Sequence, residues 1–204
     1  ANTPTALPIT ISSNDAGVLL SSDAAAVGSN SIQITVPQQQ GLDGSGFPTF
    51  YIQALPSALG HNVTLTASAN GWTSATTAIT VTPSGFVLIS PNGLGADFGT
   101  TKTSADVALA VSARQLQAGT FVPQTTQQLR PGLSLPPNTF PVTVVSDSSL
   151  VGTVFDGPAG FNGGDENVTV HFRANNQGTT LLHITQPTGF STPSTGASLH
   201  ATVN

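Results

Sequence analysis

Cysteine and methionine are absent from this chain of 204 residues, and charged residues are scarce. Without cysteine, the chain can form no disulfide and no thiolate metal site. It has 4 Lys or Arg against 9 Asp or Glu, a net charge of -5, so cations are too few to follow a nucleic-acid backbone. No apolar run approaches the roughly 18 residues that a membrane-spanning helix needs. The sequence therefore predicts a protein that binds no nucleic acid and has no membrane span.

Titratable groups are also too few and too scattered to indicate a catalytic centre. The chain has 4 His and lacks the Gly-x-Ser-x-Gly pattern of a nucleophile elbow. No pair of carboxylates, and no nucleophile with a neighbouring base, forms a recognisable motif. We therefore expect a protein that is not an enzyme and holds no cofactor.

Small polar residues take the place of charge, with 29 Thr and 21 Ser. Hydrophobic residues make up 38% of the chain but aromatic residues only 6%, so the core must consist of Val, Ile, Leu and Ala. Gly and Pro are spread throughout and leave few windows for a long helix. The one candidate helix, 104–117, alternates equally well at Val107, Leu109 and Val111, and we expect a strand there. Short alternating segments with turn residues between them predict a β-sandwich.

An internal repeat divides the chain into two parts. Residues 8–15 align with residues 141–148, since both begin Pro-x-Thr and end in a polar turn. A turn-rich tripeptide at 83–85 marks the joint. The sequence predicts two domains, 1–84 and 85–204.

The two parts differ in what precedes the Pro-x-Thr strand. The segment 85–140 comes before it in the second part, whereas only residues 1–7 come before it in the first. Three interpretations follow: a piece of a longer repeat array, a smaller domain variant, or an incomplete domain that takes a strand from another molecule. An incomplete sandwich would expose an unpaired sheet edge, which is a template for association.

Three segments, 10–15, 63–72 and 78–82, carry a resemblance to a known family. They combine a valine-threonine strand and Ser-Asn-Asp turn with a later Gly-aromatic turn and a closing threonine-valine strand. In these features the chain resembles tandem bacterial immunoglobulin-like (Big-type) domains of surface and adhesin-like proteins. The resemblance implies an all-β chain of two tandem immunoglobulin-like β-sandwich domains, the first lacking its opening strands. It also implies an extracellular or cell-surface location and carries over no catalytic residue.

Aromatic and acidic side chains give weak candidates for ligand binding. Tyr51 and Trp72 are candidates for stacking on sugar rings. Trp72, however, holds the same place as an aromatic residue in the second repeat, which favours a structural role. Asp156, Asp165 and Glu166 form an acidic cluster whose oxygen ligands suit a hard cation such as Ca²⁺, and they fit a plain polar turn as well.

Other polar patterns in the sequence are less specific. The loop 41–46 has a Gly/Asp composition similar to that of the acidic cluster, and the histidines lack metal-ligand spacing. Asn62 and Asn167 match the N-x-[ST] glycosylation pattern, which is expected by chance in so Asn- and Thr-rich a chain.

Taken together, these features predict a non-enzymatic structural module, a subunit or repeat of a cell-surface protein or extracellular filament. It would act by spacing and by strand- or edge-mediated assembly with copies of itself or neighbouring repeats. The chain has a single Lys, Lys102, so its hydroxyl-rich strand faces permit contact without desolvating charge. A carbohydrate-binding or adhesion module, with glycans as partners, and a non-catalytic appendage of a secreted enzyme are the alternatives.

Overall fold

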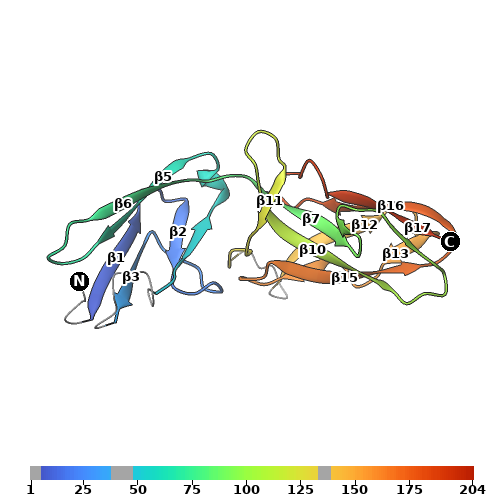
Figure 1. The fold of residues 1–204 in the computed structure, drawn as a ribbon, viewed down its shortest axis with the longest axis horizontal. Coiled ribbons are helices and arrows are strands. Elements are labelled where there is room, and N and C mark those ends of the chain that lie inside the picture. The colour runs from blue at the N-terminus through green and yellow to red at the C-terminus, as the bar shows by residue number, and fades with distance from the viewer. Residues whose placement is uncertain (1–5, 38–47, 133–138) are drawn as a thin grey trace. The chain divides into compact units, whose positions relative to one another are not determined.

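The computed structural model describes residues 6–37, 48–132 and 139–204 and consists almost entirely of β-strands (Figure 1). The one helix among these residues is a single 3-10 turn, Pro56–Ala58. The expected all-β fold is confirmed, and the segment with the ambiguous pattern holds strand β10 (Val107–Leu116). In the described part of the chain, no helix has the length and hydropathy needed to cross a bilayer.

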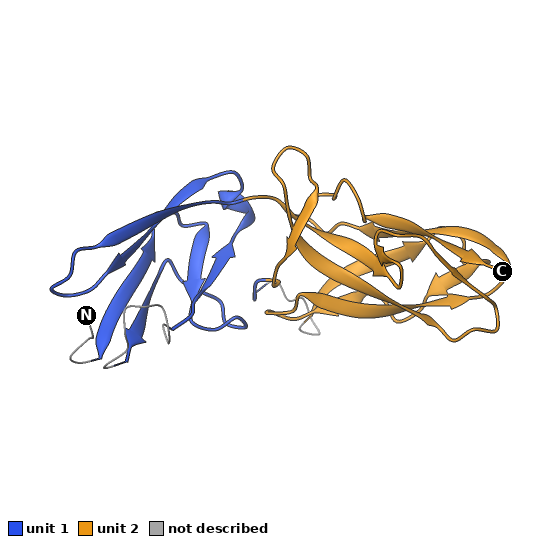
Figure 2. Ribbon diagram, in the orientation of Figure 1, with its two compact units in different colours: residues 1–81, 130–132 blue, residues 82–129, 133–204 orange. Residues whose placement is uncertain are grey.

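The chain folds as two compact units (Figure 2). Unit 1 comprises residues 1–81 with 130–132, and unit 2 comprises residues 82–129 with 133–204. The strands of unit 1 are β1 (Leu7–Ser13), β2 (Val18–Ser21), β3 (Ser31–Val36), β4 (Tyr51–Ala54), β5 (Asn62–Ser68) and β6 (Ala75–Thr80). Besides β10, the strands of unit 2 are β7 (Ser84–Ser90), β8 (Gly93–Leu94), β9 (Phe98–Thr100), β11 (Pro123–Thr126), β12 (Phe140–Ser146), β13 (Gly152–Val154), β14 (Ala159–Phe161), β15 (Asn167–Ala174), β16 (Gly178–Thr185) and β17 (Ser198–Val203).

Unit 2 is a sandwich of two sheets. One sheet has the order β13-β15-β10-β7-β8, with β11 also paired to β10, and the other has the order β14-β12-β16-β17-β9. All of these strands pair antiparallel except β9, which runs parallel to β17. The runs β13-β15-β10-β7 and β12-β16-β17 correspond to the two sheets of an immunoglobulin domain, strands D-E-B-A and C-F-G. Unit 2 is therefore an immunoglobulin-like β-sandwich.

The core of unit 2 follows from strict alternation along its strands. In β16, the side chains of Thr180, Leu182 and Ile184 are buried, while the residues between them are half-buried. Nineteen buried apolar residues form one cluster, to which β7, β9 and β10 contribute Phe86, Leu88, Phe98, Leu109, Val111 and Ala113. Burial of each large aliphatic or aromatic side chain contributes roughly 1.5–3 kcal/mol before the conformational entropy is counted.

Unit 1 reproduces the last six strands of unit 2. Its sheet β3-β1-β5-β6 matches β14-β12-β16-β17, its pair β2-β4 matches β13-β15, and the order along the chain is the same. The turn after the first strand matches as well: the Ser13 hydroxyl donates to the Asp15 carbonyl at 3.0 Å, and that of Ser146 donates to the Ser148 carbonyl at 3.4 Å. The described residues of unit 1 contain no counterpart of β7, β9 or β10.

The Gly-aromatic turn is also shared between the two units. Trp72 N–H donates to the carbonyl three residues earlier at 3.1 Å, and Phe190 N–H does the same at 3.1 Å. Gly71 and Gly189 precede these aromatic residues with φ of 78° and 91°. A type II turn requires such a φ at its third position, which explains the glycine in both copies.

Candidate interaction site: the open face of unit 1

Two strands of unit 1 have an unpaired outer edge. In unit 2, β10 pairs with β15 and β9 pairs with β17. The corresponding edges of β4 and β6 meet no strand among the described residues of unit 1. Such an edge presents a row of backbone N–H and C=O groups to any extended chain that reaches it.

The inward side chains of β6 are left uncovered. Thr77 and Ile79 occupy the places of Leu199 and Ala201 in β17, because each faces the equivalent residue of the neighbouring strand. Leu199 and Ala201 are 1% and 0% exposed. Thr77 is exposed and Ile79 only half-buried. The face that β9 and its neighbours cover in unit 2 is therefore open in unit 1.

The inward face of β4 is uncovered in the same way. Ile52 pairs with Leu20 as Phe172 of β15 pairs with Val154. Phe172 is 0% exposed and lies opposite Val107 of β10, whereas Ile52 is 45% exposed. The side chain that would lie over Ile52 is missing from the described part of unit 1.

The aromatic residue of the shared turn shows the same contrast. The ring of Phe190 packs on two phenylalanines, with centroids 4.7 Å from Phe86 of β7 and 5.6 Å from Phe140. Among the described residues of unit 1 no counterpart of β7 lies beside Trp72, which is 49% exposed. The exposure of Trp72 is thus explained by the same absent strands as that of Ile52.

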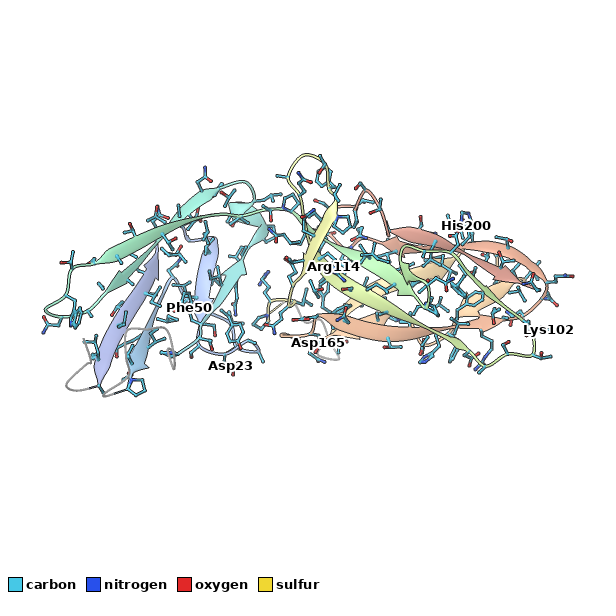
Figure 3. All side chains as sticks on the ribbon, in the orientation of Figure 1. Asp23, Phe50, Lys102, Arg114, Asp165 and His200 are labelled. Carbon is cyan, nitrogen blue, oxygen red and sulfur yellow. The ribbon has the colours of Figure 1, made fainter. Side chains whose placement is uncertain are left out.

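Unit 1 consequently has a small core, and the strands at its open edges carry no charge. Its core contains six buried apolar residues, with seven half-buried ones packed against them. The only Lys or Arg in the sequence of unit 1 is Arg130, and β4 and β6 carry no charged residue at all. Lys102 and Arg114, labelled in Figure 3, belong to unit 2. Open edges are usually guarded by charge or proline, so these unguarded strands are suited to pairing with another uncharged strand. We call the inward residues Ile52 of β4 and Thr77 and Ile79 of β6, together with Trp72, the open face.

Unit 2 carries a second candidate, a cluster of charged and aromatic side chains on β15. Arg173 donates from Nε and Nη2 to the two carboxylate oxygens of Asp106 at 2.9 and 2.7 Å, and its guanidinium lies 4.1 Å from the centre of the Phe155 ring. These hydrogen bonds hold the pKa of Asp106 below its usual value. The backbone N–H of His171 donates to Asp156 at 2.6 Å. Burial works to raise the pKa of Asp156, but its hydrogen bonds with His171 outweigh burial and lower it. The charged side chains of this cluster form hydrogen bonds with one another. This arrangement is that of a structural cluster that joins β15 to neighbouring segments.

Each of the four histidines lies beside an aspartate. The nitrogen-to-oxygen distances are 2.7 Å for His61–Asp15, 3.1 Å for His183–Asp147 and 3.4 Å for His200–Asp97, and His171 contacts Asp156. The hydrogen bond from His61 lowers the pKa of Asp15. Within residues 6–37, 48–132 and 139–204, no three His, Asp or Glu residues gather as a metal-binding group. Side-chain hydrogen bonds join His61 to Asp15 and His171 to Asp156, and the backbone N–H of His200 donates to Asp97, whereas Nδ1 of His183 is buried without a hydrogen-bond partner among the described residues.

The structure separates the acidic residues singled out from the sequence. Asp156 lies beside His171 in the middle of β15, whereas Asp165 and Glu166 precede the first residue of that strand, about 17–20 Å away for an extended strand. The Asp165 carboxylate accepts a hydrogen bond from the backbone N–H of Asn162 at 2.7 Å and so closes a turn. Cation binding at these residues stays a prediction.

The other candidates from the sequence lie on separate elements. Tyr51 is half-buried on β4, while Trp72 is exposed in the turn between β5 and β6, so they belong to different sheets. Asn62 and Asn167 are exposed first residues of β5 and β15, where a glycan would have room. The loop 41–46 lies outside the described residues.

Sequence reasoning singled out Asp156 of the β15 cluster but not Ile52, Arg173 or Asp106. Extending the repeat alignment strand by strand would have set Ile52 against Phe172. Arg173 and Asp106 are 67 residues apart, and no local pattern links them.

No family model matches this chain, and no curated protein matches its sequence. Among solved structures, the chain is similar to domains 4 and 5 of the S-layer protein SbsC, with 14% identity and a TM-score of 0.42 over 96% of this chain and 75% of that one. It is similar to a longer structure of SbsC, domains 1–6, with 15% identity and a TM-score of 0.37 over 96% of this chain and 20% of that one. It is also similar to the D0-D1 domain of intimin, with 11% identity and a TM-score of 0.31 over 98% of this chain and 80% of that one.

Proposed function

We propose that the chain is a non-enzymatic structural module of an extracellular or cell-surface protein, acting by spacing and by strand addition. Unit 2 is the spacer, a closed sandwich with its own core. Unit 1 is the assembly unit, which associates with neighbouring subunits through the open edges of β4 and β6. The observation that supports this role is the open face, where Ile52 is 45% and Trp72 is 49% exposed.

Strand addition at these edges is favourable for two physical reasons. An added strand supplies backbone hydrogen bonds, each worth about 0.5–1.5 kcal/mol net. It also removes apolar surface from water at roughly 25 cal/mol per Å². Neither gain is reduced by desolvation of charge, because β4 and β6 carry none. Against these gains stands the loss of translational and rotational freedom, which several such contacts together can exceed.

The surface chemistry of unit 2 supports the role of a spacer. Two of its polar pairs, Arg173 with Asp106 and His171 with Asp156, hold neighbouring segments together. Its apolar residues are gathered into the nineteen-residue core. A module of this kind can transmit force and set a distance.

A charge placed on the inner face of β6 tests the proposal. We expect the wild-type chain to form larger species with rising concentration in light scattering, and ordered assemblies in electron microscopy. Thr77→Lys should abolish this association, because it puts an ammonium group on the open face. Thr76→Lys, on the outer face of the same strand, is the matched control and should still associate. Both threonines are exposed, so neither change should unfold unit 1.

A single species at all concentrations would contradict the assembly role, and so would equal effects of the two lysine variants. In either case, the exposure of Trp72 would favour the second candidate function, a glycan-binding module that stacks sugar rings on this side chain. Titration with a panel of glycans while following Trp72 fluorescence would test that alternative, since the chain has a single Trp.

A further inference from the structure

We propose that the connection between β16 and β17 seals the free edge of β7, so that this edge of unit 2 takes no added strand and assembly is directed to unit 1. The residues that do so are Gln186 and 191–196, and we call them the seal. All of them belong to unit 2. Their role rests on the proposed function, because strand addition is the contact that a closed spacer has to avoid.

Most of the outer edge of β7 has no strand beside it. On one side, β10 pairs with β7 from Ser84 to Ile89. On the other side, β8 pairs only with Ile89 and Ser90. No other strand in the described part of unit 2 pairs with residues 84–88. A bare edge of this length would offer its backbone groups to any extended chain.

Backbone groups of the seal bond to both ends of this edge. The N–H of Ser191 donates to the carbonyl of Ser84 at 2.8 Å. The N–H of Leu88 donates to the carbonyl of Gly196 at 2.8 Å, and the carbonyl of Leu88 accepts from the N–H of Gly95 at 2.8 Å. The seal therefore takes the place of a neighbouring strand at Ser84 and Leu88.

The side chain of Gln186 completes the seal between these two ends. Its Oε1 accepts a hydrogen bond from the N–H of Phe86 at 3.0 Å, and its Nε2 donates to the carbonyl of Phe86 at 2.8 Å. A side-chain amide carries the same donor and acceptor as a peptide group, so it satisfies both backbone groups at once. Unlike a strand, it presents no further backbone edge of its own.

The seal also covers the outer face of β7. The side chain of Val87 alternates with the core residues of β7 and points away from the core, yet Val87 is 0% exposed. A Cβ atom at Gly85 would collide with the carbonyl oxygen of Ser191, and one at Gly196 would lie 3.3 Å from the Cβ of Val87. The seal thus lies directly against the strand.

The connection in unit 1 lacks the residues that complete the seal. It consists of residues 69–74, which match 187–192 because the shared Gly-aromatic turn has the same hydrogen bond in both. The strands on either side keep the same register in the two units. Gln186 and residues 193–196 are therefore additional in unit 2, the unit whose β7 they contact.

Hydrogen exchange of single amides tests the seal in the folded chain. In the unmodified chain, the amides of Phe86 and Leu88 should exchange within about tenfold of that of Val111, which lies between two strands. Gln186→Met keeps the length of the side chain but removes its amide, and should speed exchange at Phe86 by at least about tenfold. Gln128→Met makes the same change at an exposed glutamine of unit 2 and should leave Phe86 unchanged.

Shortening the connection to its length in unit 1 tests what the seal prevents. The short-turn variant lacks Gln186 and residues 193–196, and both it and its parent carry Thr77→Lys, so that the open face does not contribute. We expect the parent to remain a single species in light scattering. The short-turn variant should form larger species with rising concentration, in which the β7 amides are protected from exchange again. Far-ultraviolet circular dichroism checks that the variant keeps its strands.

The proposal is overturned if the amides of Phe86 and Leu88 in the unmodified chain exchange as fast as those of exposed loops. It is also overturned if Gln186→Met and Gln128→Met behave alike, or if a folded short-turn variant remains a single species at all concentrations. If shortening unfolds unit 2, the amide comparison decides alone. The proposed function fails on another observation, a wild-type chain that does not associate, so the two failures are distinguishable.

Discussion

Replacing one leucine by alanine at equivalent places in the two units tests whether unit 1 relaxes around a cavity more readily than unit 2. The quantity compared is the loss of unfolding free energy. Leu65 and Leu182 hold equivalent places, opposite Ser13 and Ser146 respectively. Leu182 is 0% exposed in a core of nineteen residues, and Leu182→Ala should leave a cavity that its neighbours cannot fill. The cost should be about 3–5 kcal/mol of unfolding free energy for unit 2. Leu65 is 4% exposed in a core of six, and Leu65→Ala should cost about 2–3 kcal/mol, because an open site relaxes and loses mainly the transfer term.

The chain provides a separate probe for each unit. Its single Trp and single Tyr, Trp72 and Tyr51, both lie in unit 1, so intrinsic fluorescence in a urea titration reports on that unit. Far-ultraviolet circular dichroism reports on the strands of both units. We expect an earlier transition seen by both probes and a later one seen by circular dichroism alone. Leu182→Ala should move only the later transition, and Leu65→Ala only the earlier one.

Leu181→Ala is the control for the larger effect, since it removes the same atoms from the half-buried, outward neighbour of Leu182 and should cost less. Equal losses for Leu65→Ala and Leu182→Ala would refute the argument that the open face lets unit 1 relax. A shift of the fluorescence transition by Leu182→Ala would refute the expectation that unit 1, which contains Trp72, unfolds separately from unit 2.

Two further changes test the packing and the electrostatics of unit 2. Gly152→Ala should lower the stability of unit 2 by about 1–3 kcal/mol, because the new Cβ collides with the Phe172 ring; a circular-dichroism titration in urea, with unchanged Trp72 fluorescence, would show it. The pKa of Asp106 is lowered from 3.8, so its carboxylate adds stability above that pH and the contribution disappears as the pH falls through the lower, folded value. Asp106→Asn should therefore flatten the acid side of the stability curve of unit 2, measured as urea midpoints between about pH 2 and pH 6; an unchanged curve would show that the ion pair contributes nothing.

Much of the fold follows from local pattern in the sequence. The period-two alternation in residues such as Val107, Leu109 and Val111 is what a strand with one buried face requires, and β10 forms there despite a competing helical pattern. The repeat located the Pro-x-Thr strands and the Gly-aromatic turns because both depend on short-range geometry. The unequal lengths ahead of the repeat then indicated that opening strands are missing from the first part.

The rest depends on contacts that no local pattern records. β9 has three residues and pairs in parallel with β17, about a hundred residues later, so periodicity could not reveal it. The pair of Arg173 with Asp106 likewise joins distant segments. The exposure of Ile52 could not be predicted either, because an isoleucine in an alternating strand is normally buried, and only its absent neighbour makes it different.

The exposure of the open face results from strands that have no counterpart among the described residues of unit 1, and not from a more polar sequence. If polarity alone caused the exposure, the inward residues of unit 1 would be the hydrophilic ones. Thr77 opposite Leu199 fits that explanation, but Ile79 is larger and more apolar than Ala201 and is still the less buried of the two. Trp72 likewise exceeds its counterpart in apolar surface and is 49% exposed. Large apolar side chains at an unguarded edge are unfavourable in water unless something covers them, and the strand addition proposed above would remove Ile79 and Trp72 from water.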